Sequence, residues 1–230
     1  QFRKPYALAV NYSTGAVYVA DLRNFRVQKF DSNGNYLLAW GRRGSWDGDF
    51  LVIDGIDVDA AGNVFVVDSL NRSIQKFDGN GRFLARWGGR TNPIQGVQEP
   101  GDIAVAPTRE IYIVDKTTMS VGRLDSKGEL VSLLRRSKDA LGDLNEPSDI
   151  DVDSMGNVYV ADAGNHRIVK FSSAGKILAA WGNLGAGKGQ FNSTYGLAID
   201  IPPSGKVYVA DSGNHRIQVF GINKSATGSK

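Results

Sequence analysis

One short pattern recurs along this chain and constrains its fold more than any other feature. Each copy alternates apolar and aromatic residues and closes with an aspartate, and the copies are Ala16–Asp21, Asn63–Asp68, Glu110–Asp115, Asn157–Asp162 and Lys206–Asp211. Successive closing aspartates are 47, 47, 47 and 49 residues apart. A fixed period of this length over nearly the whole chain indicates a repeat protein, in which neighbouring units share a core.

Each repeat predicts four short antiparallel strands. A first strand such as Gly55–Asp59 leads through a glycine turn into the strand that ends in the recurring aspartate. A tight hairpin such as Ala163–His166 opens the third strand, Arg167–Phe171, and a fourth strand follows, as in Tyr36–Gly41. Such segments alternate and are rich in Val, Ile, Tyr and Phe, and no segment keeps a helical period. Four strands per repeat of about 45 residues predict a β-propeller blade, with a solenoid as the alternative.

Composition narrows the classes of protein without naming a function. Of 230 residues, 41% are apolar and 22% are charged, which excludes a disordered chain, collagen or a coiled coil. Cysteine is absent, so disulfide frameworks, thiolate zinc sites and cysteine nucleophiles are excluded, while the compartment stays open. No apolar run is long enough to cross a bilayer and no signal peptide is visible, so we expect no membrane insertion. The formal net charge of +3 gives a mild preference for anionic partners.

The hairpins and linkers resemble the NHL repeat. The runs Asp162–Ile168 and Asp211–Ile217 carry Asn-His-Arg where that family has Asn-His-Leu, and Trp181-Gly182, Gly189–Phe191 and Gly196–Asp200 resemble the family's linker pattern. The third repeat departs most, with Lys116–Ser120 in place of the Asn-His-Arg run and Leu134 in place of tryptophan. The resemblance implies an all-β propeller, commonly of six blades.

The chain shows five repeats, and the last ends after its third strand, Ile217–Phe220, without an outer strand. We therefore expect either five blades of a larger, six-bladed ring or a small ring with one three-stranded blade. The predicted organisation is a single propeller domain over residues 1–222 and a polar tail over 223–230. The predicted blades span about 3–50, 51–99, 100–147, 148–195 and 196–222.

Several recurring residues have a structural interpretation. In three repeats an arginine follows the closing aspartate by five residues, which predicts the hairpin pairs Asp21/Arg26, Asp162/Arg167 and Asp211/Arg216. The tryptophans that end fourth strands, Trp40, Trp87 and Trp181, are expected to pack between blades.

Two segments imitate metal or catalytic motifs without completing them. Asp57-x-Asp59-x-x-Gly62 and its copy starting at Asp151 resemble an EF-hand loop, but the fifth position is Ala61 or Met155, which offers no side-chain ligand. Some enzymes with this propeller, the peptidyl-hydroxyglycine amidating lyases, hold zinc on several histidines. Here His166 and His215 occupy the same place in two hairpins and do not supply a three-histidine site. We therefore expect no catalytic residue, metal or cofactor, and keep a metal-dependent lyase or lactonase as a distant alternative.

A binding surface is predicted on one face of the propeller. Hairpins between second and third strands share that face with the linkers between blades, and Trp46 stands among arginines in one linker. The candidate residues are Arg42, Arg43, Trp46, Arg90, Lys116, Arg135, Arg136, His166 and His215. We expect a non-catalytic scaffold that binds a protein partner, as a module of a larger chain or assembly. The alternative is binding of single-stranded RNA through the basic residues, and the cytoplasm and the cell surface are both compatible.

Overall fold

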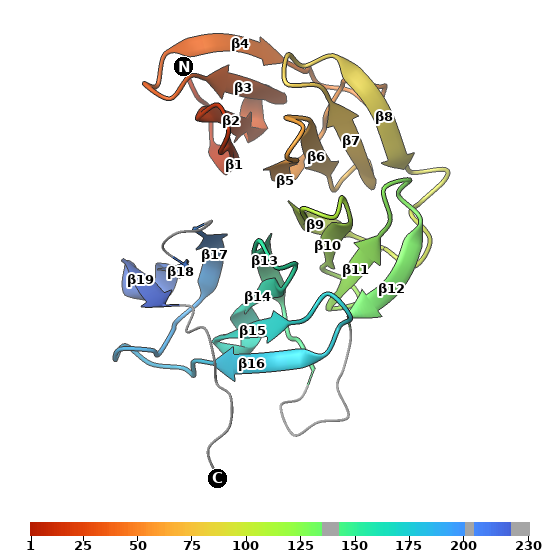
Figure 1. Ribbon diagram of the computed structural model, residues 1–230. Helices are drawn as coiled ribbons and strands as arrows, with labels where there is room; N and C mark the ends of the chain where they lie inside the picture. Colours follow the sequence, from red (N-terminus) through yellow and green to blue (C-terminus); the bar gives the residue numbers. More distant parts are fainter. Residues whose placement is uncertain (135–142, 201–204, 222–230) are drawn as a thin grey trace. The chain divides into compact units, whose positions relative to one another are not determined.

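The computed structural model describes residues 1–134, 143–200 and 205–221, all of which lie in strands, turns and loops apart from three single-turn 3₁₀ helices. The chain divides into two compact units, unit 1 (Gln1–Arg135) and unit 2 (Arg136–Lys230). Consecutive strands form five antiparallel sheets, four of four strands and one of three (Figure 1). Among the described residues, no helix is long and apolar enough to cross a membrane.

Unit 1 contains three sheets in which each strand pairs with its neighbours in the sequence. The first sheet is formed by β1 (Pro5–Asn11), β2 (Ala16–Asp21), β3 (Arg26–Phe30) and β4 (Tyr36–Trp40). The second is formed by β5 (Ile53–Val58), β6 (Val64–Asp68), β7 (Ser73–Phe77) and β8 (Phe83–Gly88). The third is formed by β9 (Pro100–Val105), β10 (Ile111–Asp115), β11 (Ser120–Leu124) and β12 (Leu130–Leu134).

Unit 2 contains the other two sheets. The fourth sheet is formed by β13 (Pro147–Val152), β14 (Val158–Asp162), β15 (Arg167–Phe171) and β16 (Ile177–Trp181). The fifth is formed by β17 (Thr194–Ile199), β18 (Lys206–Asp211) and β19 (Arg216–Gly221). The 3₁₀ turns η1 (Leu22–Asn24), η2 (Ala163–Asn165) and η3 (Ser212–Asn214) lie in hairpins between second and third strands.

The recurring strand forms the buried centre of each complete sheet. Every residue of β6, β10 and β14 is buried, because a second strand has a strand on either side and another sheet can cover its faces. The register places the residue before the closing aspartate opposite the first apolar residue of the third strand, as in Ala161↔Ile168. That residue in turn faces the tryptophan of the fourth strand, as in Ile168↔Trp181. The repeated sequence thus builds a repeated register.

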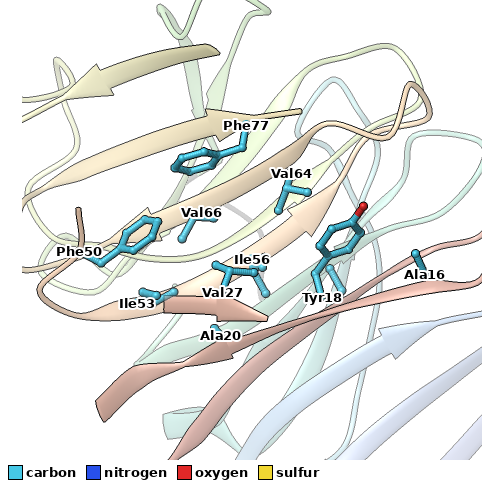
Figure 2. Packing of buried hydrophobic residues seen from close by; sticks show 11 residues of the cluster. Ala16, Tyr18, Ala20, Val27, Phe50, Ile53, Ile56, Val64, Val66 and Phe77 are labelled. Atoms are coloured by element: carbon cyan, nitrogen blue, oxygen red, sulfur yellow. The ribbon is translucent and has the colours of Figure 1, made fainter. Parts of the chain in front are cut away.

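Aromatic side chains join neighbouring sheets, and Figure 2 shows the cluster between the first and second sheets. The ring of Trp40 lies 6.1 Å from Tyr18 of its own sheet and 5.6 Å from Phe77 of the next, centroid to centroid. A Cβ on Gly81, in the turn after β7, would come within 2.7 Å of the Trp40 ring, and the φ of Gly81 is +81°. Only glycine combines this conformation with that close approach. Burial of each large side chain here contributes roughly 1.5–3 kcal/mol.

The same arrangement recurs in unit 2, where the Trp181 ring lies 6.0 Å from Phe220 of the fifth sheet. The prediction that fourth-strand tryptophans pack between blades is confirmed for Trp40 and Trp181, and also for Trp87, which packs on the cluster shared by the second and third sheets. In the third sheet Leu134 takes the tryptophan's place opposite Val121 and is buried. The all-β propeller of NHL-type blades is confirmed, and so is a fifth sheet whose third strand pairs with no further strand among the described residues. The ring size and the blade boundaries stay predictions, and the tail 223–230 lies outside the described residues.

Candidate functional site

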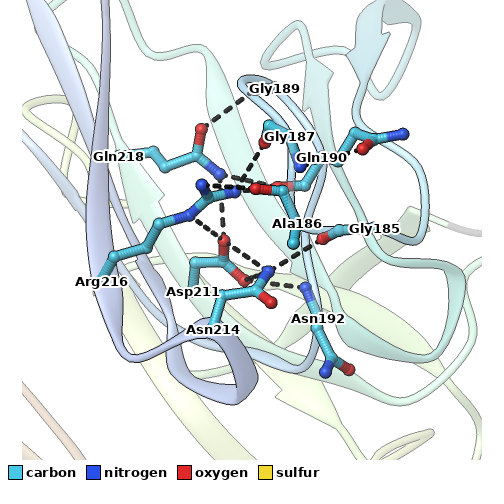
Figure 3. Close-up of polar contacts among 10 residues, drawn as sticks. All are labelled: Gly185, Ala186, Gly187, Gly189, Gln190, Asn192, Asp211, Asn214, Arg216 and Gln218. Carbon is cyan, nitrogen blue, oxygen red and sulfur yellow. Dashed lines mark hydrogen bonds and ion pairs between the residues drawn. The ribbon is translucent and has the colours of Figure 1, made fainter.

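The closing aspartates tie each hairpin to the linker before its sheet. Asp211 is fully buried and accepts the backbone N–H of Asn192 at 2.7 Å (Figure 3). Its carboxylate also accepts hydrogen bonds from Asn214, from Arg216 Nε at 2.7 Å and from Gln218 Nε2 at 3.0 Å. Burial raises the pKa of Asp211, but the four donors together outweigh burial and hold this pKa below its usual value.

Asp68 occupies the same position in the second sheet with a poorer set of donors. It accepts the backbone N–H groups of Leu51 and Val52 and the side chain of Asn71, but Ser73 stands where Arg216 stands in the fifth sheet. Burial dominates and raises the pKa of Asp68, because the N–H groups of Val52, Leu51 and Asn71 offset it only in part. The repeat therefore fixes the position of the carboxylate but not its affinity for protons.

The hairpin pairs predicted from the sequence are present as ion pairs. Arg26 lies 3.3 Å from Asp21, Arg167 lies 2.6 Å from Asp162 and Arg216 lies 2.7 Å from Asp211, nitrogen to oxygen. All three carboxylates are buried, and backbone N–H groups of the linkers hold them as well. These groups therefore serve the scaffold and are not available to a ligand.

The linker loop 41–49 of unit 1 is held on both sides. Within the loop, Phe50 donates its N–H to Arg42 O at 2.8 Å, and Arg42 Nε lies 2.8 Å from Asp49 Oδ1. From the second sheet, Gln75 accepts the N–H of Gly48 and donates to Asp49 O, each at 2.8 Å. Phe50 anchors the loop from below and is fully buried.

Two more side chains of the second sheet reach the same loop. Asn71 donates to Gly44 O at 3.0 Å, and Arg86 donates to Ser45 O at 2.9 Å and to Asp47 at 3.2 Å. Arg86 comes from the fourth strand, β8, and one of its nitrogens lies 3.5 Å from the hydroxyl of Ser73. Arg86 on β8 therefore binds the carbonyl groups of this loop, as Arg216 on the third strand β19 does for the equivalent loop of unit 2.

This fixed loop presents a large aromatic residue to solvent. The side chain of Trp46 is 77% exposed, and Arg42 and Arg43 beside it are exposed as well. Arg43 packs over the ring of Phe25 at 5.7 Å, so it is oriented by the hairpin of the first sheet. The Trp46 side chain therefore faces solvent and does not cover a blade.

A groove of about 870 Å³ opens beside this loop, between the hairpins of the second and third sheets. Its walls are the hairpin Ser69–Arg72, the linker 90–99 and Thr117. Leu70, Pro93, Ile94 and Val97 give it an apolar part. Arg72 and Arg90 line it as well, and neither forms an ion pair within the described part of the chain. We call loop 41–49, hairpin 69–72 and linker 90–99 together the Trp46 face.

The structure brings four of the nine predicted binding residues into this region: Arg42, Arg43, Trp46 and Arg90. Lys116 does not add a free charge to it, because its ammonium lies 2.8 Å from Asp54 Oδ2 and the side chain packs on Gly101. Asp54 lies on the first strand of the neighbouring sheet, far away in the sequence, and a binding role for Lys116 stays a prediction. Arg135 and Arg136 lie outside the described residues.

The two histidines belong to unit 2 and have a structural explanation. His166 and His215 have φ of +52° and +54° and follow the 3₁₀ turns η2 and η3. The same left-handed position is filled by Phe25, Arg72 and Met119 in the other hairpins. Residues of such different chemistry share a backbone conformation, and histidine is among those that tolerate it. Nothing in the described residues assembles His166 or His215 with two further metal ligands.

The EF-hand-like aspartates also have partners in the backbone. Asp57 accepts the N–H of Val58 and, from the first strand of the next sheet, that of Val105 at 2.7 Å. Burial raises the pKa of Asp57 to about 7. Asp151 makes the equivalent bond to the N–H of Ile199 at 2.6 Å. These carboxylates join neighbouring first strands, and the described residues contain no group of three or more His, Cys, Asp or Glu that could hold a metal ion.

Sequence reasoning missed the groove and its apolar residues Leu70 and Ile94. Two strands, β7 and β8, separate the hairpin from the linker along the chain, so no local pattern marks them as neighbours. The available signal was an arginine, Arg72, at the left-handed hairpin position, which projects its side chain beside the next linker.

Comparisons with known proteins agree with this architecture. The family model of the NHL repeat matches residues 2–30, 144–171 and 196–220. No curated protein matches the chain in sequence.

Solved structures share the fold at low identity. A structure of a nidogen/laminin complex has a TM-score of 0.71 and 17% identity, over 95% of this chain and 76% of that one. A protein of unknown function from Bacteroides caccae has a TM-score of 0.66 and 14% identity, over 90% and 70%. Virginiamycin B lyase from Staphylococcus aureus has a TM-score of 0.61 and 14% identity, over 95% and 70%. Such identities establish the fold alone. Its recurring hairpins and antiparallel sheets, together with these matches, show a β-propeller that contains NHL repeats at residues 2–30, 144–171 and 196–220.

Proposed function

We propose that the protein is a non-catalytic binding module and that the Trp46 face of unit 1 binds a protein partner. The observation that carries the proposal is Trp46, 77% exposed at the tip of a loop that both neighbouring sheets hold in place. An aromatic side chain on a rigid loop loses little conformational entropy on binding, which is why tryptophan is frequent among residues that dominate interface energy.

The groove beside the loop supports a protein ligand. Its apolar residues, with Leu70 exposed at the rim, suit the side chains of a peptide, while Arg72 and Arg90 suit its acidic groups. Asn71 links the two parts, because it belongs to the groove hairpin and donates to Gly44 O of the loop.

The charges around Trp46 favour protein over nucleic acid. Arg42 is paired with Asp49, Arg86 is paired with Asp47, and Glu99 lines the groove. A phosphate backbone would meet these carboxylates as well as the arginines, whereas a protein surface offers charges of both signs. The lyases share only the fold, and no cluster of described residues favours an enzymatic function.

The test compares captured proteins between variants. The immobilised chain is exposed to extract of the source cells, in parallel with Trp46→Ala and with the double variant Arg72→Ala, Arg90→Ala. A specific partner should bind the unchanged chain and lose at least about tenfold in affinity with Trp46→Ala, the size expected for a dominant interface residue. Met155→Ala is the matched control, since Met155 is exposed in a turn at the opposite end of its sheet from the hairpins.

A second measurement separates the RNA alternative. Binding to a random single-stranded RNA pool is followed by fluorescence anisotropy across a salt series. We expect no binding with a steep salt slope. Micromolar binding that falls steeply with salt, and that disappears when Arg42, Arg43 and Arg90 become alanine, would overturn the protein proposal in favour of RNA. Capture of the same proteins by wild type and by both groups of variants would also overturn it.

A further inference from the structure

The groove of the Trp46 face is bordered by a linker that lacks the polar contacts holding the linker before the second sheet. Gln75 in the second sheet and Gln218 in the fifth each bind the linker that precedes their sheet, and the equivalent residue of the third sheet is Gly122. A Cβ on Gly122 would lie 3.4 Å from Val97 Cγ2, so Val97 packs beside the position from which a glutamine would extend. Linker 90–99 therefore rests on the third sheet through an apolar contact at this point.

The first half of this linker makes no hydrogen bond that would fix it. Thr118 stands where Asn71 stands in the second sheet, but its hydroxyl group lies 2.7 Å from that of a neighbouring serine and binds no linker carbonyl. The linker is hydrogen-bonded to the third sheet through Gln98 and Glu99. Within the part of the chain that the structure describes, residues 90–93 form no hydrogen bond. This wall of the groove can therefore adjust its shape to a ligand.

Two arginines without a partner lie at one end of the groove. Arg72 ends the hairpin and Arg90 begins the linker, and the pairing Ser73↔Gly88 brings these two walls together. Both side chains are exposed, and among the described residues neither guanidinium group forms an ion pair or a hydrogen bond. Guanidinium groups bind carboxylates through charge-assisted hydrogen bonds, often two at a time. This end of the groove therefore favours an acidic group.

The groove becomes apolar and then acidic along the linker. Leu70, Pro93 and Ile94 line its apolar part, and the Leu70 side chain is 55% exposed. Glu99 lines the end next to the third sheet, where it accepts a hydrogen bond from Thr117 Oγ1 at 3.0 Å. This order of basic, apolar and acidic groups complements an extended ligand whose acidic group lies at one end only.

We propose that the groove binds an extended peptide segment of a partner protein in which an aspartate or glutamate stands next to an apolar residue. The carboxylate lies between Arg72 and Arg90, and the apolar side chain lies on Leu70 and Ile94. The linker closes over the segment and becomes ordered when it binds. This inference rests on the proposed function, because the groove belongs to the Trp46 face, and it specifies the chemistry of the segment that the partner places there.

A random library of displayed twelve-residue peptides, selected on the immobilised full chain, is the probe. We expect the selected sequences to share an aspartate or glutamate beside an apolar residue. The most frequent sequence is then synthesised with blocked ends, and its dissociation constant is measured by fluorescence anisotropy. Replacing its acidic residue by the corresponding amide should weaken binding at least about tenfold, the size expected for hydrogen bonds to a charged group. Linker 90–99 should exchange its amide hydrogens more slowly when the peptide is bound.

The chain offers a matched control for the two arginines. The double variant Arg72→Ala, Arg90→Ala should bind the peptide at least about tenfold more weakly. The double variant Arg82→Ala, Arg109→Ala removes the same charge from exposed positions in turns at the opposite ends of the second and third sheets. It should change the affinity by less than about twofold at physiological salt, because distant exposed charges are screened. All four side chains are exposed, so we expect both variants to fold normally, which circular dichroism checks.

Two outcomes would overturn the inference. One is a selection without acidic residues, or a selected peptide that does not bind saturably. The other is peptide binding that persists without the two groove arginines, or that the control variant weakens to the same extent.

Failure of this inference is distinguishable from failure of the proposed function. If protein capture depends on Trp46 while the peptide does not respond to the groove arginines, this inference alone is wrong. If the peptide needs the groove arginines while protein capture does not depend on Trp46, the role proposed for Trp46 is wrong and the groove assignment stands.

Discussion

Two linker loops, 41–49 in unit 1 and 182–190 in unit 2, are held by equivalent hydrogen bonds but differ in the residues that they expose to solvent. Each is closed by an isolated parallel bridge, Arg43↔Phe50 or Leu184↔Phe191, and each rests on a fully buried phenylalanine. Each receives a glutamine from the following sheet, Gln75 or Gln218, through the same pair of hydrogen bonds. Yet loop 41–49 carries Trp46, where loop 182–190 has Gly187.

The difference lies in how each loop is completed. In unit 2, Arg216 of the third strand pairs with Asp211 and donates to Ala186 O and Gly187 O (Figure 3). In unit 1, Arg86 of the fourth strand donates to Ser45 O, the equivalent of Ala186, and leaves Asp68 without an arginine. Buried anchors thus fix the loop, and its exposed positions are free to carry a binding function.

The largest expected effect comes from the shared anchor. Phe50→Ala and Phe191→Ala each remove a fully buried ring under the loop, and each should lower the free energy of unfolding by about 3–5 kcal/mol. The measurement is chemical denaturation followed by hydrogen exchange in each loop. Similar losses in the two loops would support a common design, and a loss below about 1 kcal/mol in either would contradict it.

A smaller loss is expected from the two arginines, and it should be unequal. Arg216→Ser removes a bond to a buried carboxylate and several bonds to loop carbonyls, so the free energy of unfolding should fall by about 2 kcal/mol. Arg86→Ala removes contacts to Ser45 and Asp47 but none to Asp68, and about 1 kcal/mol should be lost. Chemical denaturation of both variants at one pH compares the two losses in the free energy of unfolding. A larger loss for Arg86→Ala than for Arg216→Ser would contradict the roles given to the two arginines.

The two hairpin aspartates should respond to pH in opposite directions. The pKa of Asp211 is lowered on folding, so its contribution to stability is present above the unfolded pKa of about 3.9 and is lost as pH falls through the folded pKa. The pKa of Asp68 is raised, so its contribution is present below about 3.9 and is lost as pH rises through the folded pKa.

Denaturation midpoints between pH 3 and 7 test this contrast. Asp211→Asn should reduce the loss of stability toward acid, and Asp68→Asn should reduce the loss on going from acid toward neutral pH. Each slope is limited to one proton, or about 1.4 kcal/mol per pH unit. If the pH dependence of stability changed in the same direction in both variants, the different hydrogen-bond donors of Asp211 and Asp68 would not set their pKa values in opposite directions.

The smallest effect on stability belongs to the most exposed residue. Trp46→Ala should change the free energy of unfolding by less than about 0.5 kcal/mol, since the Trp46 side chain lies outside the core. The same denaturation assay checks it, with Gly187→Trp as the reciprocal variant in unit 2. A loss above about 2 kcal/mol for Trp46→Ala would mean that Trp46 supports the scaffold instead of a partner.

Much of the fold could be predicted from the sequence, because the repeated pattern depends on contacts between residues that are close along the chain. The alternation in Val158–Asp162, the glycine turns and the five-residue spacing of Asp162 and Arg167 each report contacts within one sheet. The tryptophans were predictable as packing residues because they recur at one register position. The sequence pattern also predicted three strands in the fifth sheet, and three are present among the described residues.

The candidate site was less predictable, because it depends on contacts between repeats. The sequence indicates that Lys116 is a basic hairpin residue, but its ammonium group forms an ion pair with Asp54 on β5, the first strand of the neighbouring sheet. Asp57 and Asp59 read as an imitation of a calcium loop, but the N–H of Val105 in the next sheet takes up the Asp57 carboxylate. Neither partner lies within the repeat that contains the residue, so spacing along the chain did not reveal it.

The sequence by itself determined the strands, the hairpin ion pairs and the repeat, because each depends on residues that are close along the chain or recur at a fixed period. Only the tertiary structure decided which exposed residues are free to bind. Trp46 and Trp40 are the same residue type a few positions apart, yet Trp40 packs against Phe77 of the neighbouring sheet and Trp46 meets solvent. Ile168 and Ile217 hold the same repeat position, yet one is buried and the other exposed, since burial depends on whether another strand and another sheet are there to cover it.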